Sequence, residues 1–165
     1  MAEIEEADMR KAIKTVLCVA ALAAVTTTSV GAGEFDRAIK ARKAQMSLVG
    51  FQMGVLGSMA KGKAPYDAKA AQAAADNMVA LSHMNSSALW PKGSDNVANP
   101  GMTRAKPDAW TTWPKIKEAG DAWKAASTKM AAAAGGGLDS LKGAMGGLGK
   151  ACGGCHKPFR APKKK

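Results

Sequence analysis

The chain has 165 residues, of which 24 are lysine or arginine and 13 are aspartate or glutamate, so its net charge is +11 at neutral pH. This length favours a single domain, and the positive charge favours a partner with an acidic surface. No aromatic or glycine-rich binding motif accompanies the basic residues, so nucleic acid is not an expected partner. A purely solubilising role of the charge, including the C-terminal "APKKK", stays open.

The first segment predicts export. Basic residues between positions 10 and 14 precede an apolar run at about 16–25 and then a stretch of small residues, which is the build of a secretory signal peptide. The apolar run of roughly 10 residues is too short to span a bilayer, which needs about 20. We expect cleavage near Ala32, so that residues 1–32 are removed and residues 33–165 form one periplasmic domain without stable membrane insertion. A short helix kept in the mature protein is the alternative.

Four segments have apolar residues at alternating spacings of three and four, which predicts four amphipathic helices that pack together. We expect these helices at about residues 35–60, 67–88, 113–134 and 138–159. Asp67 is a natural N-cap, and Pro114 suits the first turn of a helix. Strand patterns are weak, so the predicted fold is all-α. It is an antiparallel four-helix bundle with one long loop, of about 20 residues, that joins the second helix to the third across one end of the bundle.

The last predicted helix contains "CGGCH", in which Cys152 and Cys155 lie on the apolar stripe and His156 follows one turn after Cys152. A redox dithiol, part of a zinc site and a haem anchor all use such residues. A zinc site needs four ligands. Once Cys18 is removed with the signal peptide, the other candidate zinc ligand among the cysteines and histidines is His83, which we expect to be a packing or surface residue. A thioredoxin-like site needs a βαβ context that is absent. We therefore predict one haem c within the bundle, attached by thioether bonds to both cysteines, with His156 as an axial ligand of its iron.

The first predicted helix carries Arg42 and Met46 on its apolar stripe. A buried guanidinium is costly without an anion, and a haem propionate could supply that anion. An arginine that extends to the surface is an equally good interpretation. A methionine on such a stripe is usually core filler, and Met53 lies on the same face, so spacing alone does not choose an iron ligand.

Six glycines lie between Gly143 and Gly154 in the last predicted helix. Each interior glycine costs a helix about 0.5–1 kcal/mol relative to alanine. Either a flat macrocycle pressed against the backbone or close packing of a neighbouring helix would explain these small residues. The first interpretation predicts that the haem-free protein is largely unfolded or molten.

Three stretches resemble the class II cytochromes c, which include cytochrome c prime and its low-spin relatives: "RKAQMSLVGFQMGVLGSMAKGKAPYD", "TRAKPDAW" and "ACGGCHKPFR". The resemblance covers residues 34–160 and implies an exported four-helix bundle with covalent haem. In the low-spin branch of this family, a methionine four residues after the first-helix arginine is the sixth iron ligand. Here the arginine is Arg42 and the methionine is Met46. The resemblance also implies that Arg42 lies near a haem propionate and Arg160 near the proximal histidine.

The resemblance to the six-coordinate branch implies a one-electron carrier, not an enzyme, with His156 and Met46 as axial ligands and an acidic redox protein as partner. The alternative is a five-coordinate cytochrome c prime-like protein that binds nitric oxide or carbon monoxide at the distal haem face. A homodimer is compatible with the resemblance, because dimers are common in this family.

Overall fold

The computed structural model describes residues 31–163, with side chains from Phe35 onward. Residues Gly33–Lys165 form one compact unit. The predicted signal peptide, with Cys18 in it, lies outside the described residues except for its last two positions. Its removal therefore stays a prediction.

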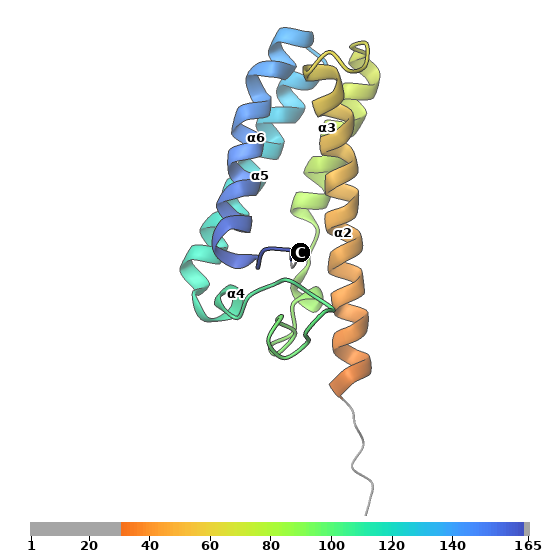
Figure 1. Cartoon of the computed structure of the whole chain (residues 1–165). Coiled ribbons are helices and arrows are strands. Elements are labelled where there is room, and N and C mark those ends of the chain that lie inside the picture. Colours follow the sequence, from red (N-terminus) through yellow and green to blue (C-terminus); the bar gives the residue numbers. More distant parts are fainter. Residues whose placement is uncertain (1–30, 164–165) are drawn as a thin grey trace, which may run out of the picture. The chain divides into compact units, whose positions relative to one another are not determined.

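Four long helices form the bundle: α2 (Gly31–Ala60), α3 (Ala68–His83), α5 (Trp113–Ala134) and α6 (Leu138–Phe159). They run antiparallel in chain order, with short turns from α2 to α3 and from α5 to α6 at the same end (Figure 1). The long connection from α3 to α5 contains a 3₁₀ turn, Ser87–Leu89, and a short helix, α4 (Asp108–Thr111). Residues 31–163 contain no strand, only one isolated antiparallel bridge. The predicted all-α antiparallel bundle is confirmed.

Local sequence signals set several of the helix ends. The Asp67 carboxylate accepts a hydrogen bond from the Ala70 backbone N–H at 2.9 Å, as expected of an N-cap. Pro114 lies in the first turn of α5. Gly137, with φ of +110°, adopts a conformation that favours glycine and separates α5 from α6. The third and fourth predicted helices therefore agree with α5 and α6.

The second helix is shorter than predicted, because α3 ends at His83 and not at residue 88. Met84, the next residue, is extended, with ψ of 134°. The Asn85 side-chain oxygen accepts hydrogen bonds from the Ser87 N–H at 3.2 Å and from the Ser87 hydroxyl at 2.8 Å. Such local bonds offer the backbone an alternative to the helix, so the sequence Asn-Ser-Ser ends α3 early. His83 is exposed at this end.

Apolar side chains from all four helices meet in one core. Trp113 lies outside this core and is 68% exposed, because it is the first residue of α5, where the helix leaves the loop. Gln45 of α2 donates a hydrogen bond to the Leu81 carbonyl of α3 at 3.0 Å, which adds a polar tie between these helices. The buried members of the core are Val49, Leu56, Met59, Ala71, Ala74, Ala75, Met78, Met130, Ala134, Leu141 and Leu148.

Tyr66 joins the two short connections at one end of the bundle. Its hydroxyl donates a hydrogen bond to the Ala134 carbonyl at 2.8 Å and accepts one from the Gly137 N–H at 3.0 Å. One phenol thus ties the α2–α3 turn to the α5–α6 turn, and the long connection closes the opposite end (Figure 1).

Among the described residues, no helix is both long enough and apolar enough to cross a membrane.

Candidate functional site

The last two turns of α6 carry the predicted haem-binding residues. Cys152, Cys155 and His156 are each partly buried, and both cysteines are free thiols. Burial raises the pKa of both thiols, so they are neutral near pH 7. Burial lowers the pKa of His156, and the positive charges of Arg160 and Arg104 lower it further. The imidazole is therefore neutral near pH 7 and keeps the nitrogen lone pair that a metal ligand requires.

The zinc alternative finds no support in the described part of the chain. No group of three or more histidine, cysteine, aspartate or glutamate side chains there is arranged to hold a metal ion. A structural zinc site requires four such ligands. His83 lies exposed at the end of α3 and offers none to the cysteines of α6.

Arg42 is buried, with 3% of its surface exposed, as its place on the apolar stripe predicted. Its Nη1 donates to the Ser94 hydroxyl at 2.6 Å and to the Leu89 carbonyl at 3.3 Å. Its Nη2 donates to the Ser94 carbonyl and, at 2.9 Å, to the Thr103 hydroxyl. The long connection therefore supplies four oxygen contacts to one guanidinium, and an arginine that extends to the surface is excluded.

Two indole rings complete the surroundings of Arg42. Its central guanidinium carbon lies 4.9 Å from the Trp90 ring centroid and 5.7 Å from that of Trp110, so both rings can stabilise the cation. Burial lowers the pKa of Arg42, and the charge of Asp95 opposes this, but a guanidinium stays protonated in proteins. Among the described residues, the Nε–H is the donor that has no hydrogen bond. The contact with a propionate stays a prediction, for which Nε–H is the remaining donor.

The long connection also pairs with the chain just after the predicted proximal ligand, His156. The Lys106 N–H donates to the Phe159 carbonyl at 2.9 Å, and the Ala161 N–H donates to the Arg104 carbonyl at 2.8 Å. The Arg104 Nε–H donates in return to the Ala161 carbonyl at 2.8 Å. Sequence reasoning did not predict this pairing, which holds the C-terminal end of α6 against residues 104–106.

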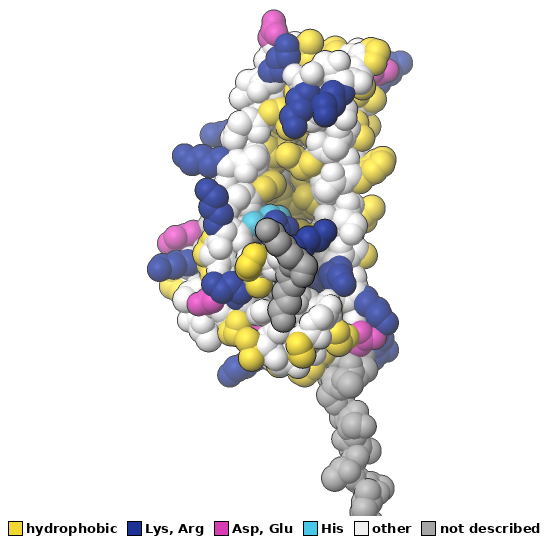
Figure 2. Space-filling model, viewed as in Figure 1, with side chains coloured by type: hydrophobic (Ala, Val, Ile, Leu, Met, Phe, Trp, Pro, Cys, Tyr) yellow, Lys and Arg dark blue, Asp and Glu magenta, His cyan; other side chains and the backbone are white. Residues whose placement is uncertain are grey.

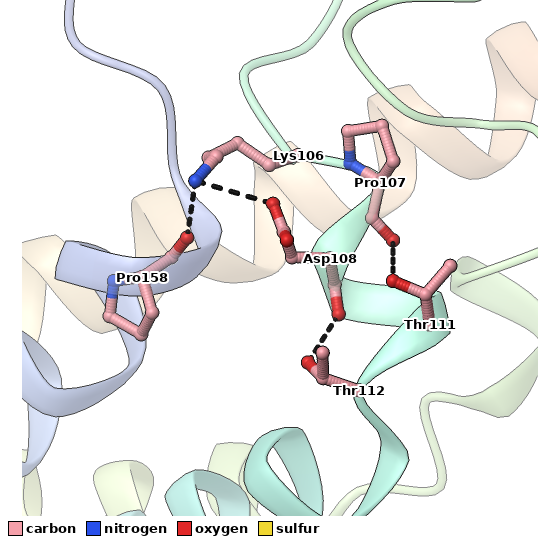
Figure 3. Close-up of polar contacts among 6 residues, drawn as sticks. All are labelled: Lys106, Pro107, Asp108, Thr111, Thr112 and Pro158. Atoms are coloured by element: carbon pink, nitrogen blue, oxygen red, sulfur yellow. Dashed lines mark hydrogen bonds and ion pairs between the residues drawn. The ribbon is translucent and has the colours of Figure 1, made fainter.

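Lys106 extends this junction toward α4. Its ammonium group donates to the Pro158 carbonyl at 2.9 Å and lies 3.2 Å from the Asp108 carboxylate, so it bridges the last turn of α6 and the first residue of α4 (Figure 3). The Thr112 hydroxyl donates to the Asp108 carbonyl at 2.6 Å, and the Thr111 hydroxyl makes a longer bond of this kind one residue earlier (Figure 3). The Lys106 contacts therefore hold α4 beside the end of α6, and the two threonine bonds lie within α4 and its flanks.

Met46 lies on α2 one turn after Arg42, where it is partly buried and packs against the core. Met53 is also partly buried and packs against the same core, so burial does not separate the two methionines. In the space-filling view, the face between α6 and α2 is hollowed, and hydrophobic side chains line the hollow (Figure 2).

Two features fit a haem group beside α6. An added Cβ on any of the six glycines at positions 143–154 would have no neighbouring atom within 4 Å, so close packing of another helix does not explain them. Gly149 precedes Cys152 by three residues and His156 by seven, and it lies on their face of the helix, where a flat ring could approach the backbone. The indole Nε1 of Trp123 is buried and has no hydrogen-bond partner among the described residues, which indicates that a further acceptor belongs nearby. The donor set of two thiols, a neutral imidazole and a thioether therefore fits haem c.

An open groove of about 920 Å³ lies between α5 and α6, apart from the predicted ligands. Alanines and glycines form much of its lining, together with Lys115, Lys129 and Lys150, and neither Cys152 nor Cys155 contributes to it. These three lysines form no ion pair within residues 35–163. Lys106, Asp108 and Glu118 also line the groove, so it holds four lysines and two acids and is basic on balance.

Comparison with known proteins places these features in a family. A family model described as Cytochrome C' matches residues 37–160, a range that includes every predicted ligand. The chain is 40% identical over 139 residues to cytochrome c-554 of Cereibacter sphaeroides, which covers 84% of this chain and 90% of that protein.

Solved structures agree with this match. Cytochrome c′ from Rhodobacter Spheriodes has a TM-score of 0.76 at 35% identity, with 79% of this chain and 99% of that one covered. A variant of cytochrome c prime from Alcaligenes xylosoxidans, solved as a nitric oxide complex, has a TM-score of 0.69 at 29% identity, with 79% of this chain and 98% of that one covered.

Proposed function

The chain belongs to the cytochrome c′ family, whose members carry covalently bound haem c with iron, and we propose that it is a periplasmic one-electron carrier with His156 and Met46 as axial ligands. The observation that carries this proposal is the position of Met46. Its thioether is partly buried on α2, one turn from the tightly held Arg42.

The proposed roles of the residues follow from their chemistry. Haem, when bound, supplies one-electron oxidation and reduction at its iron. Cys152 and Cys155 would hold the ring by thioether bonds, and His156 would offer a neutral nitrogen to its iron. Met46 would offer a neutral sulfur to the same iron and would exclude water from it. Histidine–methionine ligation and a buried site both raise the reduction potential, and because neither ligand leaves, electron transfer needs little rearrangement.

The proposed partner is a redox protein with an acidic surface. The unpaired lysines of the α5–α6 groove and the net charge of +11 support this choice, because a basic surface steers acidic partners at low salt. On α2, Leu48 and Phe51 are 52% and 67% exposed, which supports a homodimer through this helix. The proposed site holds no acid–base pair that acts on a substrate, so we propose a carrier and not an enzyme.

The second candidate function is binding of nitric oxide or carbon monoxide at an open distal face. The comparisons favour it at the level of the family, because many relatives are named cytochrome c′ and one was solved as a nitric oxide complex. The residue at position 46 favours the carrier. The two functions therefore differ in whether a thioether occupies the sixth position of the iron.

The test is an absorption spectrum of the purified holoprotein, followed by the same measurement on Met46→Leu. We expect a low-spin ferric spectrum for the native protein, and a high-spin protein that binds carbon monoxide readily for the variant. Met53→Leu is the matched control, because Met53 lies on the same helix with similar burial, and it should change neither property. A high-spin native protein would rule out Met46 as ligand and favour the gas-binding function.

A further inference from the structure

The oxygen atoms around Arg42 come from a loop that is far away in the sequence. We propose that Arg42, Ser94 and Thr103 form a clamp that holds the long connection against α2 and thereby keeps Met46 in position to ligate the iron. This proposal rests on the proposed function, since it assigns the clamp a role in the axial ligation described there. It makes Arg42 and its two hydroxyl partners positioning residues.

The contacts of the clamp match an arginine in particular. Ser94 contributes both its hydroxyl and its carbonyl, and Thr103 contributes its hydroxyl, so the two terminal nitrogens of Arg42 each meet oxygens of the loop. Trp90 and Trp110 lie against the guanidinium. A lysine has three donors on one nitrogen and no planar fork, so it could not make this set of contacts.

The charge of Arg42 is balanced without a direct ion pair. Asp95 is the acidic group whose charge acts on Arg42, but its carboxylate accepts hydrogen bonds from the Val97 and Ala98 N–H groups at 2.8 and 3.0 Å. The Asp95 carboxylate is thus bonded within the loop, and the atoms of the loop that contact Arg42 are neutral oxygens. A buried cation stays in place only while these oxygens do, so the loop and the helix hold each other.

The same loop reaches the other side of the predicted haem site. Thr103 binds Arg42, and the next three residues, 104–106, pair with the chain directly after α6. One short segment therefore contacts the α2 turn before Met46 and the residues that follow His156. If the clamp opens, α2 loses its buried bonds to the segment that supports the proximal ligand and keeps the exposed bond from Lys43 to the Met102 carbonyl. The weaker ligand, the Met46 sulfur, is then the one expected to leave.

A propionate role for Arg42 makes a different prediction. Ser94 and Thr103 of the loop already accept hydrogen bonds from the two terminal nitrogens of Arg42. A propionate could therefore accept a hydrogen bond from Nε–H. Removal of either hydroxyl would then leave the propionate contact intact. Variants of these two partners, with Arg42 unchanged, therefore separate the clamp from the propionate role.

The experiment uses holoprotein with Thr103→Val and with Ser94→Ala. The matched controls are Thr128→Val and Ser58→Ala, whose hydroxyls donate to carbonyls within their own helices, outside the long connection, and do not contact Arg42. Two properties are measured on each variant: carbon monoxide affinity with the ferric spin state, and hydrogen exchange of the backbone amides at 89–103. The free energy of a hydrogen bond to a charged group is large enough to change an equilibrium constant by about tenfold or more. We therefore expect the exchange rate and the carbon monoxide affinity to rise by about this factor in the clamp variants. Both should stay unchanged in the controls.

The two readouts separate the possible failures. Unchanged exchange in the clamp variants would overturn the clamp, whatever the native ligation proves to be. Faster exchange with unchanged carbon monoxide affinity in a low-spin protein would overturn the link to Met46. A high-spin native protein would reject the proposed axial ligation and this link with it, and exchange would still decide whether the clamp exists. In a Met46→Leu background, Thr103→Val should add nothing to carbon monoxide affinity, and an additional tenfold rise there would also contradict the proposal.

Discussion

Two glycines of α6 offer a test of where the haem lies. Gly147 and Gly149 are both exposed and both lie in the interior of the helix, and an added Cβ would contact nothing within 4 Å at either position. Gly147 lines the groove toward α5, whereas Gly149 shares the face of Cys152 and His156. The two alanine substitutions therefore differ mainly in which atoms the new methyl group contacts in the holoprotein.

The expected magnitudes follow from helix propensity and from packing. In the groove, Gly147→Ala should stabilise the holoprotein by about 0.5–1 kcal/mol, which raises the melting temperature by roughly 2–6 °C in a domain of this size. In Gly149→Ala the same gain is opposed by a methyl group pressed into the space of the macrocycle, and overpacking costs about 1–3 kcal/mol. We therefore expect Gly149→Ala to lower the melting temperature and to change the haem spectrum.

The assays are thermal unfolding of the holoprotein, followed by circular dichroism and by haem absorbance, and circular dichroism of chains made without haem. In the haem-free chains both variants should raise the helix content equally, from a state that we expect to be largely unfolded or molten. If Gly149→Ala stabilises the holoprotein as much as Gly147→Ala does, no haem lies against that turn. A native-like haem-free protein would also refute the argument that the glycines need haem for support.

Two further predictions test the fold and the surface. Tyr66→Phe removes both hydrogen bonds between the two short turns and should lower the free energy of unfolding of the holoprotein by about 1–3 kcal/mol in urea titrations; an unchanged midpoint would mean that this tie adds nothing. Lys129→Glu combined with Lys150→Glu should slow oxidation of the reduced protein by ferricyanide, an anion, by up to about tenfold at low salt, with little difference at 1 M salt. An equal slowing with an uncharged oxidant would contradict an electrostatic role of the groove.

The parts of the fold that sequence patterns predicted well have strong local signals. Helix α5 begins with Pro114 in its first turn, and α6 begins after Gly137. Both helices were expected at the residue ranges where they occur, because these signals act within one turn of the chain. The end of α3 was missed for a related reason: the Asn85 side chain competes with the helix locally, and the apolar pattern does not record that competition.

Sequence patterns of this kind could not predict which residues contact Arg42. Its place on the apolar stripe predicted burial, and the cost of a buried guanidinium suggested a haem propionate as a partner. That contact stays a prediction, whereas the partners within the chain are neutral oxygens at Leu89, Ser94 and Thr103, which are 47 to 61 residues away in sequence. Only the folded loop brings them together, since neither serine nor threonine in a loop predicts a contact with a distant helix.

The choice between electron transfer and gas binding depends on a small part of this molecule. Relatives named cytochrome c-554 and cytochrome c′ match the chain at 40% and 35% identity over most of its length, so the bundle and its core serve both. Position 46 is occupied by a side chain that can ligate iron, and the turn before it is held by a buried cation with four bonds to a loop. A bundle that only packed a methionine would not need that cation, because an apolar residue at position 42 would cost less to bury. Packing alone therefore does not explain Arg42, and the proposed clamp accounts for it whichever function the protein has. Whether a thioether fills the sixth position of the iron is decided by the ferric spin state of the native protein and of Met46→Leu.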